Sequence, residues 1–203
     1  MTPEHLIAFN LVLMAAIASP GAALLFAIRT SVASGRAAGV ATGLGLGLMA
    51  ALWTLAALLG LDGLFALFPW AYGALKLGGA VYLIWIAVKT WRQARTDPGA
   101  APKPRGRAFL DGLLVNLGNP KSVLFAAAVI VVIFPAALTP REIALIFTNH
   151  LALEWLFYTA FAYALSSAPA RRRYLGAKPT LDRIAALLLG GLGLKLLLQR
   201  DLP

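Results

Sequence analysis

Three polar side chains fall on one face of an apolar stretch towards the C-terminal end of the 203-residue chain. His150, Glu154 and Tyr158 are spaced four residues apart, so on a helix they lie one turn above another. An ionisable residue inside a long apolar segment is costly and is a functional candidate by default. Glu154 could bind the ammonium group of a substrate or take up a proton, and Lys121 is its expected partner. The alternative to a functional role is a structural one, in which Glu154 and Lys121 form a buried pair that only holds helices together.

Two prolines interrupt apolar stretches one hundred residues apart. Pro20 follows Ser19, and Pro120 follows Asn119. Proline has no N–H to donate to the carbonyl four residues earlier, so that carbonyl needs another partner. Beyond each interruption a new half-helix is expected, and its first unpaired N–H groups carry the positive end of the helix dipole. Two such starts would form a cradle for a carboxylate, whereas the alternative is a pair of passive kinks.

The composition of the chain predicts a membrane protein. Hydrophobic residues make up 60% of the chain and charged residues 13%, in apolar blocks too long for the core of one small soluble domain. Stretches of roughly 20 residues can each cross a bilayer as a helix. We therefore expect an all-α integral membrane fold with six transmembrane helices. The expected spans are Leu6–Ile28, Ala37–Leu61, Leu67–Val88, Phe109–Phe134, Ile143–Ala168 and Leu181–Leu198.

The distribution of basic residues predicts the topology. The net charge is +10, and most of the Lys and Arg residues fall in the first, third and fifth connections. By the positive-inside rule these connections face the cytoplasm, and both termini face outward. The basic loops are topology signals and contacts to anionic lipid, and no aromatic-interleaved motif accompanies them to indicate nucleic-acid binding. The absence of cysteine excludes thiol catalysis and cysteine-ligated metals.

A linker rich in proline, glycine and basic residues divides the chain into two halves. It reads TDPGAAPKPRG from Thr96 to Gly106. We expect one transporter domain over residues 1–203, made of a repeat at about 1–95, a cytoplasmic linker at about 96–107 and a second repeat at about 108–203. Since each half has three spans, a repeat between them must be inverted in the membrane, with the first and fourth helices broken at their prolines.

A ridge of glycines runs down the second expected span. Gly35, Gly39, Gly43 and Gly47 recur every fourth residue, so another backbone can approach that side closely. The ridge predicts either packing within the chain or a homodimer.

The motifs together resemble one family. Ser19-Pro20-Gly21, the glycine-rich second span, GGAVYLIWIAVK from Gly78 to Lys89, and Asn119-Pro120-Lys121 occur in the order found in the lysine exporter (LysE/RhtB) family of bacterial amino-acid efflux carriers. The resemblance covers nearly the whole chain. It implies a multi-pass exporter of the inner membrane that expels amino acids or related small molecules, driven by the proton motive force.

The resemblance and the residue types together give the candidate site. The candidate substrate-binding residues are Ser19, Pro20, Gly21, Asn116, Asn119, Pro120, Lys121 and Glu154. The candidates for coupling or gating are Glu154, His150, Tyr158 and Asp111. The chain departs from the family pattern at Ala22, where a second proline is usual, and at Gly47 to Ala50, where many members carry an acid.

Two other function classes are weaker. A cation or metal exporter on the same scaffold would need clustered ligands, and the chain offers no cysteine, two histidines and one central acid. A membrane enzyme acting on lipid would have only His150 with Glu154 as an acid-base pair. We therefore expect a transporter that works by alternating access, with no catalytic residue, no metal and no cofactor, and the substrate itself is open.

Overall fold

The structure is a computed structural model that describes residues 1–19, 21–67, 70–96, 107–135, 137–165 and 167–198. Every regular element in this part of the chain is an α-helix. The helices are α1 (Pro3–Ala18), α2 (Ala22–Leu67), α3 (Trp70–Gln93), α4 (Ala108–Leu117), α5 (Pro120–Ile133), α6 (Pro140–Ala164), α7 (Ala168–Gly176) and α8 (Lys178–Leu198). The prediction of an all-α protein is confirmed.

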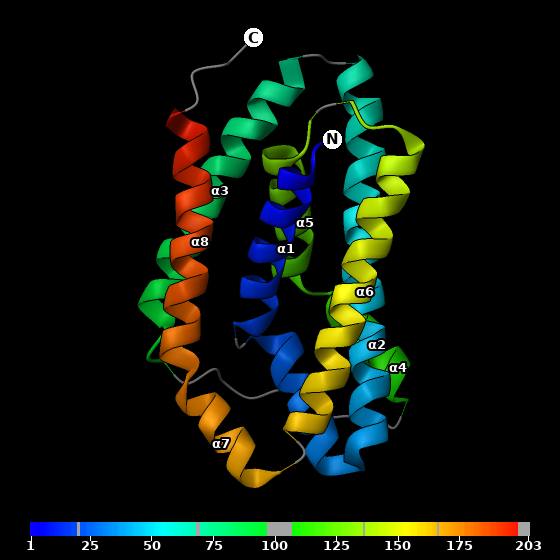
Figure 1. Cartoon of the computed structure of the whole chain (residues 1–203), viewed down its shortest axis with the longest axis vertical. Helices are drawn as coiled ribbons and strands as arrows, with labels where there is room; N and C mark the ends of the chain where they lie inside the picture. Colours follow the sequence, from blue (N-terminus) through cyan, green and yellow to red (C-terminus); the bar gives the residue numbers. More distant parts are fainter. Residues whose placement is uncertain (20, 68–69, 97–106, 136, 166, 199–203) are drawn as a thin grey trace.

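The helices form a bundle with α1 and α5 in its middle (Figure 1). On one side α3 packs against α8, and on the other α2 packs against α4 and α6. The short helix α7 joins the lower end of α8 and lies where the sequence predicts a basic connection. The core contains apolar side chains from α1, α2 and α5, among them Phe9, Leu24 and Val129.

A sharp turn divides α2 into two segments. Gly35 has φ 86° and ψ 172°, a backbone conformation that residues with a side chain rarely adopt. The first segment descends from the end of α1, and after the turn the second rises along the whole bundle (Figure 1). The turn therefore provides the connection that the sequence predicts between the first two spans.

Few of the described helices are both long enough and apolar enough to be recognised as membrane spans from these two properties alone. Among the described residues, the stretch Ala23–Gly60 is long and apolar enough to cross a membrane on its own. The pair formed by Ala108–Leu117 and Lys121–Ile133 is a second such span if its two pieces, bent by 69°, are taken together.

Gly39, Gly43 and Gly47 of the glycine ridge pack inside the chain, whereas Gly35 lies at the turn, so the use of the ridge for a homodimer is not supported. A Cβ atom added at Gly39 would meet Ser31 of the first segment of α2, and one at Gly43 would meet Tyr158 of α6. At Gly47 an added Cβ would lie 2.7 Å from the Cβ of Glu154. The ridge lets α6 approach α2 closely, which is the intramolecular alternative that the sequence left open.

The N-terminal end of α6 carries a capping box. Glu142 accepts hydrogen bonds from the N–H and hydroxyl of Thr139, and its carboxylate lies 2.6 Å from the amino group of Met1. The amino group of Met1 and the Thr139 donors favour the charged carboxylate and lower the pKa of Glu142 from its ordinary value to about 2.

This shift predicts an acid-sensitive contribution to stability. Because the pKa is lower in the folded state, the contribution is complete above the ordinary carboxyl pKa and is lost as the pH falls towards 2. In detergent, the Tm of the wild-type protein should fall more between about pH 5 and about pH 3 than the Tm of Glu142→Gln. Parallel curves for the two proteins would contradict the assignment.

Candidate functional site

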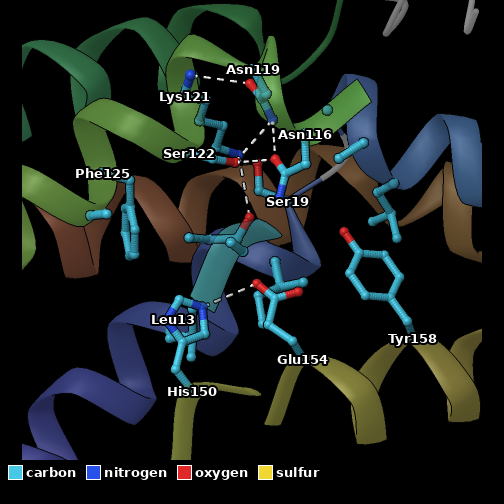
Figure 2. Close-up of a pocket in the computed structure, with 17 residues that line it drawn as sticks. Leu13, Ser19, Asn116, Asn119, Lys121, Ser122, Phe125, His150, Glu154 and Tyr158 are labelled. Atoms are coloured by element: carbon cyan, nitrogen blue, oxygen red, sulfur yellow. Dashed lines mark hydrogen bonds and ion pairs between the residues drawn. The ribbon is translucent and has the colours of Figure 1, made fainter. Parts of the chain in front are cut away.

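A cavity of about 180 Å³ lies where α1, α2, α4, α5 and α6 meet. Its polar lining brings together most of the residues that the sequence singled out (Figure 2). They are Ser19, Gly21, Asn116, Asn119, Lys121, His150, Glu154 and Tyr158, and Ser122, which was not expected, lies with them. Apolar side chains of α1, α2 and α5 complete the wall, among them Leu13, Leu24 and Phe125.

The junction of α1 and α2 forms one side of the cavity. Ser19 has an extended backbone there, and Pro20 itself lies outside the described residues. A proline at position 20 has no N–H for the Ala16 carbonyl. The Nζ of Lys121 donates to that carbonyl at 3.3 Å, so a residue of the second half of the chain supplies the missing donor.

The junction of α4 and α5 forms another part of the cavity wall. Asn119 is the N-cap of α5, and its Oδ1 accepts from the backbone N–H of Lys121 at 3.1 Å. Its Nδ2 contacts Asn116 Oδ1 at 3.2 Å and Ser122 Oγ at 3.1 Å. Asn116 in turn donates to the Leu46 carbonyl of α2 at 2.7 Å. These amide contacts fix the start of α5 against α2.

The positive group at this junction differs from the expected one. The backbone N–H groups of Lys121 and Ser122 are both taken by Asn119, through its side chain and its carbonyl. The unpaired N–H groups expected at the start of α5 are therefore already occupied. The Lys121 ammonium lies near the other junction instead, since a Cβ at Gly21 would be 3.8 Å from Nζ. A cation rather than a helix start offers the positive charge.

An acid and an imidazole occupy the α6 side of the cavity. His150 is 1% exposed, and its Nδ1 contacts Thr54 Oγ1 at 2.9 Å while its Nε2 contacts Glu154 Oε1 at 3.3 Å. Glu154 is 5% exposed, and its Oε2 is buried without a hydrogen-bond partner. Tyr158 lies one turn further along the same face (Figure 2). Half of the carboxylate is thus available to a ligand.

Two expectations for these residues differ from the structure. The described ion pairs include Glu154 with His150 but not Glu154 with Lys121, so the expected pair does not form. Asp111 is buried on α4 but does not line the cavity. Pro120 forms the first residue of α5.

Removing the cap of α5 should destabilise the protein modestly. Asn119→Ala deletes the acceptor for the Lys121 N–H and the contacts to Asn116 and Ser122. Loss of such a cap costs about 1 kcal/mol, so we expect a Tm lower by roughly 2–4 °C in detergent. Asn119→Asp keeps the capping oxygen and should retain most of the stability. Equal Tm values for Asn119→Ala and wild type would contradict this role.

Sequence reasoning missed a group of residues beside the cavity. Asp182 accepts from Ser19 Oγ at 2.6 Å and pairs with Lys178 at 2.7 Å, and the hydroxyl of Tyr174 donates to the Ala18 carbonyl at 2.5 Å. These residues fall in and after the fifth connection, whose basic residues predict only the topology. The four-residue spacing of Lys178 and Asp182 is the signal that could have shown the pair.

The arrangement defines a class of protein. Interrupted helices that meet at a buried polar cavity, with an acid and a cation inside it, are typical of membrane carriers.

Comparison with known proteins identifies the family. The chain belongs to the LysE type translocator family, which matches residues 14–200. It is 31% identical over 196 residues to the threonine efflux protein of Escherichia coli K12, covering 91% of this chain and 93% of that protein. It is 34% identical over 145 residues to the homoserine/homoserine lactone efflux protein of Salmonella typhimurium, covering 70% and 68%.

A more distant relative is the leucine efflux protein of Salmonella choleraesuis, 26% identical over 175 residues and covering 84% and 82%. No solved structure gives a significant match. The predicted family is thereby confirmed, and the chain is a membrane translocator.

Proposed function

We propose that this translocator exports amino acids or related small zwitterions from the cytoplasm across the bacterial inner membrane. The observation that carries the proposal is the cavity itself, which has a cation at Lys121 and a half-partnered buried carboxylate at Glu154. A zwitterion carries one charge of each sign, so it can satisfy both groups at once. The relatives named for threonine, homoserine and leucine efflux agree with this class of substrate.

The substrate would lie between the two junctions and α6. Its carboxylate contacts the Lys121 ammonium near Gly21, and its ammonium group contacts Glu154 Oε2. The proposed binding residues are Ser19, Gly21, Asn116, Asn119, Lys121 and Glu154, with Pro20 and Pro120 shaping the two junctions. Small apolar side chains such as Ala16, Ala50 and Ala126 leave room for the substrate side chain.

Proton coupling is assigned to the α6 face. His150 and Glu154 share a buried contact, so a proton that enters from outside can be held between them. Binding of a substrate ammonium at Glu154 and binding of a proton there exclude each other, because both use the same carboxylate. This exclusion is the physical requirement for exchanging a proton against substrate.

Transport would follow alternating access. We propose that residues at about 1–95 and 108–203 are inverted repeats, broken at Pro20 and Pro120, which rock against each other with both termini outside. The metal-export alternative is not favoured, since the described residues hold no group of three or more His, Asp or Glu side chains that could bind a metal ion.

Transport by the purified protein tests the proposal. Proteoliposomes loaded with labelled threonine, homoserine, leucine or lysine should release at least one of them faster than protein-free liposomes, and an imposed pH gradient should accelerate the release. Release that is equal with and without protein for every amino acid would overturn the proposed substrate class. Release that ignores the gradient would overturn proton coupling alone.

A further inference from the structure

A second cluster of buried polar groups lies beside the cavity, and of its members only Ser19 is also a proposed binding residue. We call it the clasp, and it consists of Ser19, Tyr174, Lys178 and Asp182. Ser19, Lys178 and Asp182 are 6%, 7% and 3% exposed. Ser19 belongs both to the clasp and to the cavity wall, so the two are adjoining.

The charged pair of the clasp is fully satisfied. Lys178 Nζ contacts Asp182 Oδ2 at 2.7 Å and the carbonyls of Gln93 and Ala94 at 2.8 and 3.2 Å. An ammonium group has three donors, and all three are used. Asp182 uses its other oxygen to accept from Ser19 at 2.6 Å. Such a pair is stable only while each of these contacts is kept, because a buried charge without a partner is costly.

The clasp joins two parts of the bundle. Lys178 binds the C-terminal end of α3 to the start of α8, and α3 and α8 pack along their length. Two hydrogen bonds then connect α7 and α8 to the end of α1, namely Asp182 with Ser19 and Tyr174 with the Ala18 carbonyl. Burial, with a smaller effect of Asp182, raises the pKa of Tyr174, so its hydroxyl remains a donor at neutral pH.

The clasp lies towards the side of the membrane that is expected to be cytoplasmic. It lies at the end of the bundle where α7 joins α8 (Figure 1). This end carries Arg172 and Arg173 of α7, which the positive-inside rule places in the cytoplasm. The clasp therefore adjoins the cavity on the side that is expected to face the cytoplasm.

We propose that the clasp is the cytoplasmic gate of the cavity and that Asp182 is its positioning residue. When the clasp is closed, Asp182 and Tyr174 hold the end of α1 against α7 and α8 and shut the cavity from the cytoplasm. When the two hydrogen bonds break, water reaches Ser19 and Asp182, and the α3–α8 pair moves away with Lys178 still bound. The inference rests on the proposed transport function, because a gate serves only a cavity that must be reached from the cytoplasm.

The natural absence of cysteine allows a direct test. Ala23→Cys puts a single thiol in the cavity wall next to the clasp. Its labelling by a membrane-impermeant maleimide is measured in inside-out and in right-side-out vesicles. Ser19→Ala and Tyr174→Phe each remove one link and leave the Lys178–Asp182 pair intact, and Asp182→Asn removes the charge and one of the two acceptor oxygens, so that Ser19 and Lys178 cannot both be satisfied.

We expect each variant to increase labelling from the cytoplasmic side, by about tenfold when both links are removed together, with no increase from the outside. The control is Glu142→Gln, an amide in place of a carboxylate in the first turn of α6, at the other end of the bundle from α7 (Figure 1), which should leave cytoplasmic labelling unchanged. Unchanged labelling in Ser19→Ala/Tyr174→Phe, or an equal increase from both sides, would overturn the gate. If Asp182→Asn fails to fold, Ser19→Ala and Tyr174→Phe still test whether the clasp is a gate.

Labelling needs no substrate, so the two proposals fail separately. Proteoliposomes that export an amino acid while the labelling rates stay constant would reject the gate alone. One-sided labelling in a protein that moves no amino acid would reject the proposed substrate class and leave the gate standing.

Discussion

Glu154→Gln is expected to lower export by roughly 10- to 100-fold and to make the residual transport insensitive to a pH gradient. Glu154 is the buried acid of the cavity, and its Oε2 has no hydrogen-bond partner. Glutamine keeps the size of the side chain but removes the negative charge that would bind the substrate ammonium. It also removes the group that exchanges a proton, so both effects should appear together.

The measurement compares gradient-driven release from proteoliposomes of wild type, Glu154→Gln and Glu142→Gln. Glu142 is the matched control, because it is also a glutamate of α6 but lies at the N-terminal end of the helix beside Thr139. Its replacement should leave export at neutral pH close to that of wild type. Wild-type export with full gradient dependence in Glu154→Gln would reject the assignment of both roles to Glu154.

A variant of Lys121, the positively charged residue of the cavity, separates substrate binding from proton coupling. Lys121→Met should weaken export through loss of the substrate carboxylate contact, while the remaining transport still responds to the pH gradient. The distinction follows from the contacts, since the Lys121 ammonium donates to the Ala16 carbonyl and forms none of the described ion pairs with Glu154.

The candidate site could be predicted in part because its signals are local. The four-residue spacing of His150, Glu154 and Tyr158 fixes their common face whatever the rest of the chain does, and all three line the cavity. The Asn119 cap is likewise local, since a side-chain oxygen before a proline at the first helical position is a standard helix start.

The partners of these residues could not be predicted, because they depend on distances between helices. Glu154 contacts His150 within its own helix, whereas Lys121 reaches across to the end of α1. The role of Asp182 could not be predicted for the same reason, since its contact with Ser19 joins residues 163 positions apart. A connection between the first two spans was predicted, but Gly35 was expected on the glycine ridge, whereas the structure places it in the turn with a positive φ that favours glycine.

The second large effect is expected at the contact of α2 with α4. A Cβ atom at Gly45 would meet the backbone oxygen of Phe109 and come within 2.9 Å of the Leu113 nitrogen. Gly112 makes the reciprocal approach, since its added Cβ would meet the Thr42 carbonyl. Backbone atoms cannot rotate aside as a side chain can, so Gly45→Ala must push the two helices apart.

This separation should reach the cavity. Asn116 lies on α4 and donates to the Leu46 carbonyl of α2, so the hydrogen bond spans the contact that Gly45→Ala would open. We expect the substitution to cost about 1–3 kcal/mol, to lower the Tm by several degrees and to abolish most export. Thermal melting in detergent and export from proteoliposomes measure the two effects.

Gly60→Ala is the matched control, because Gly60 lies on the same helix and an added Cβ there would meet nothing within 4 Å. Alanine favours a helix over glycine by about 1 kcal/mol, so this variant should be as stable as wild type or more so. A Gly45→Ala protein that melts and exports like Gly60→Ala would show that α2 and α4 are not in backbone contact. Loss of export with only a small change in Tm would instead place the effect at Asn116, because the helices would have moved enough to displace its side chain without unfolding the bundle.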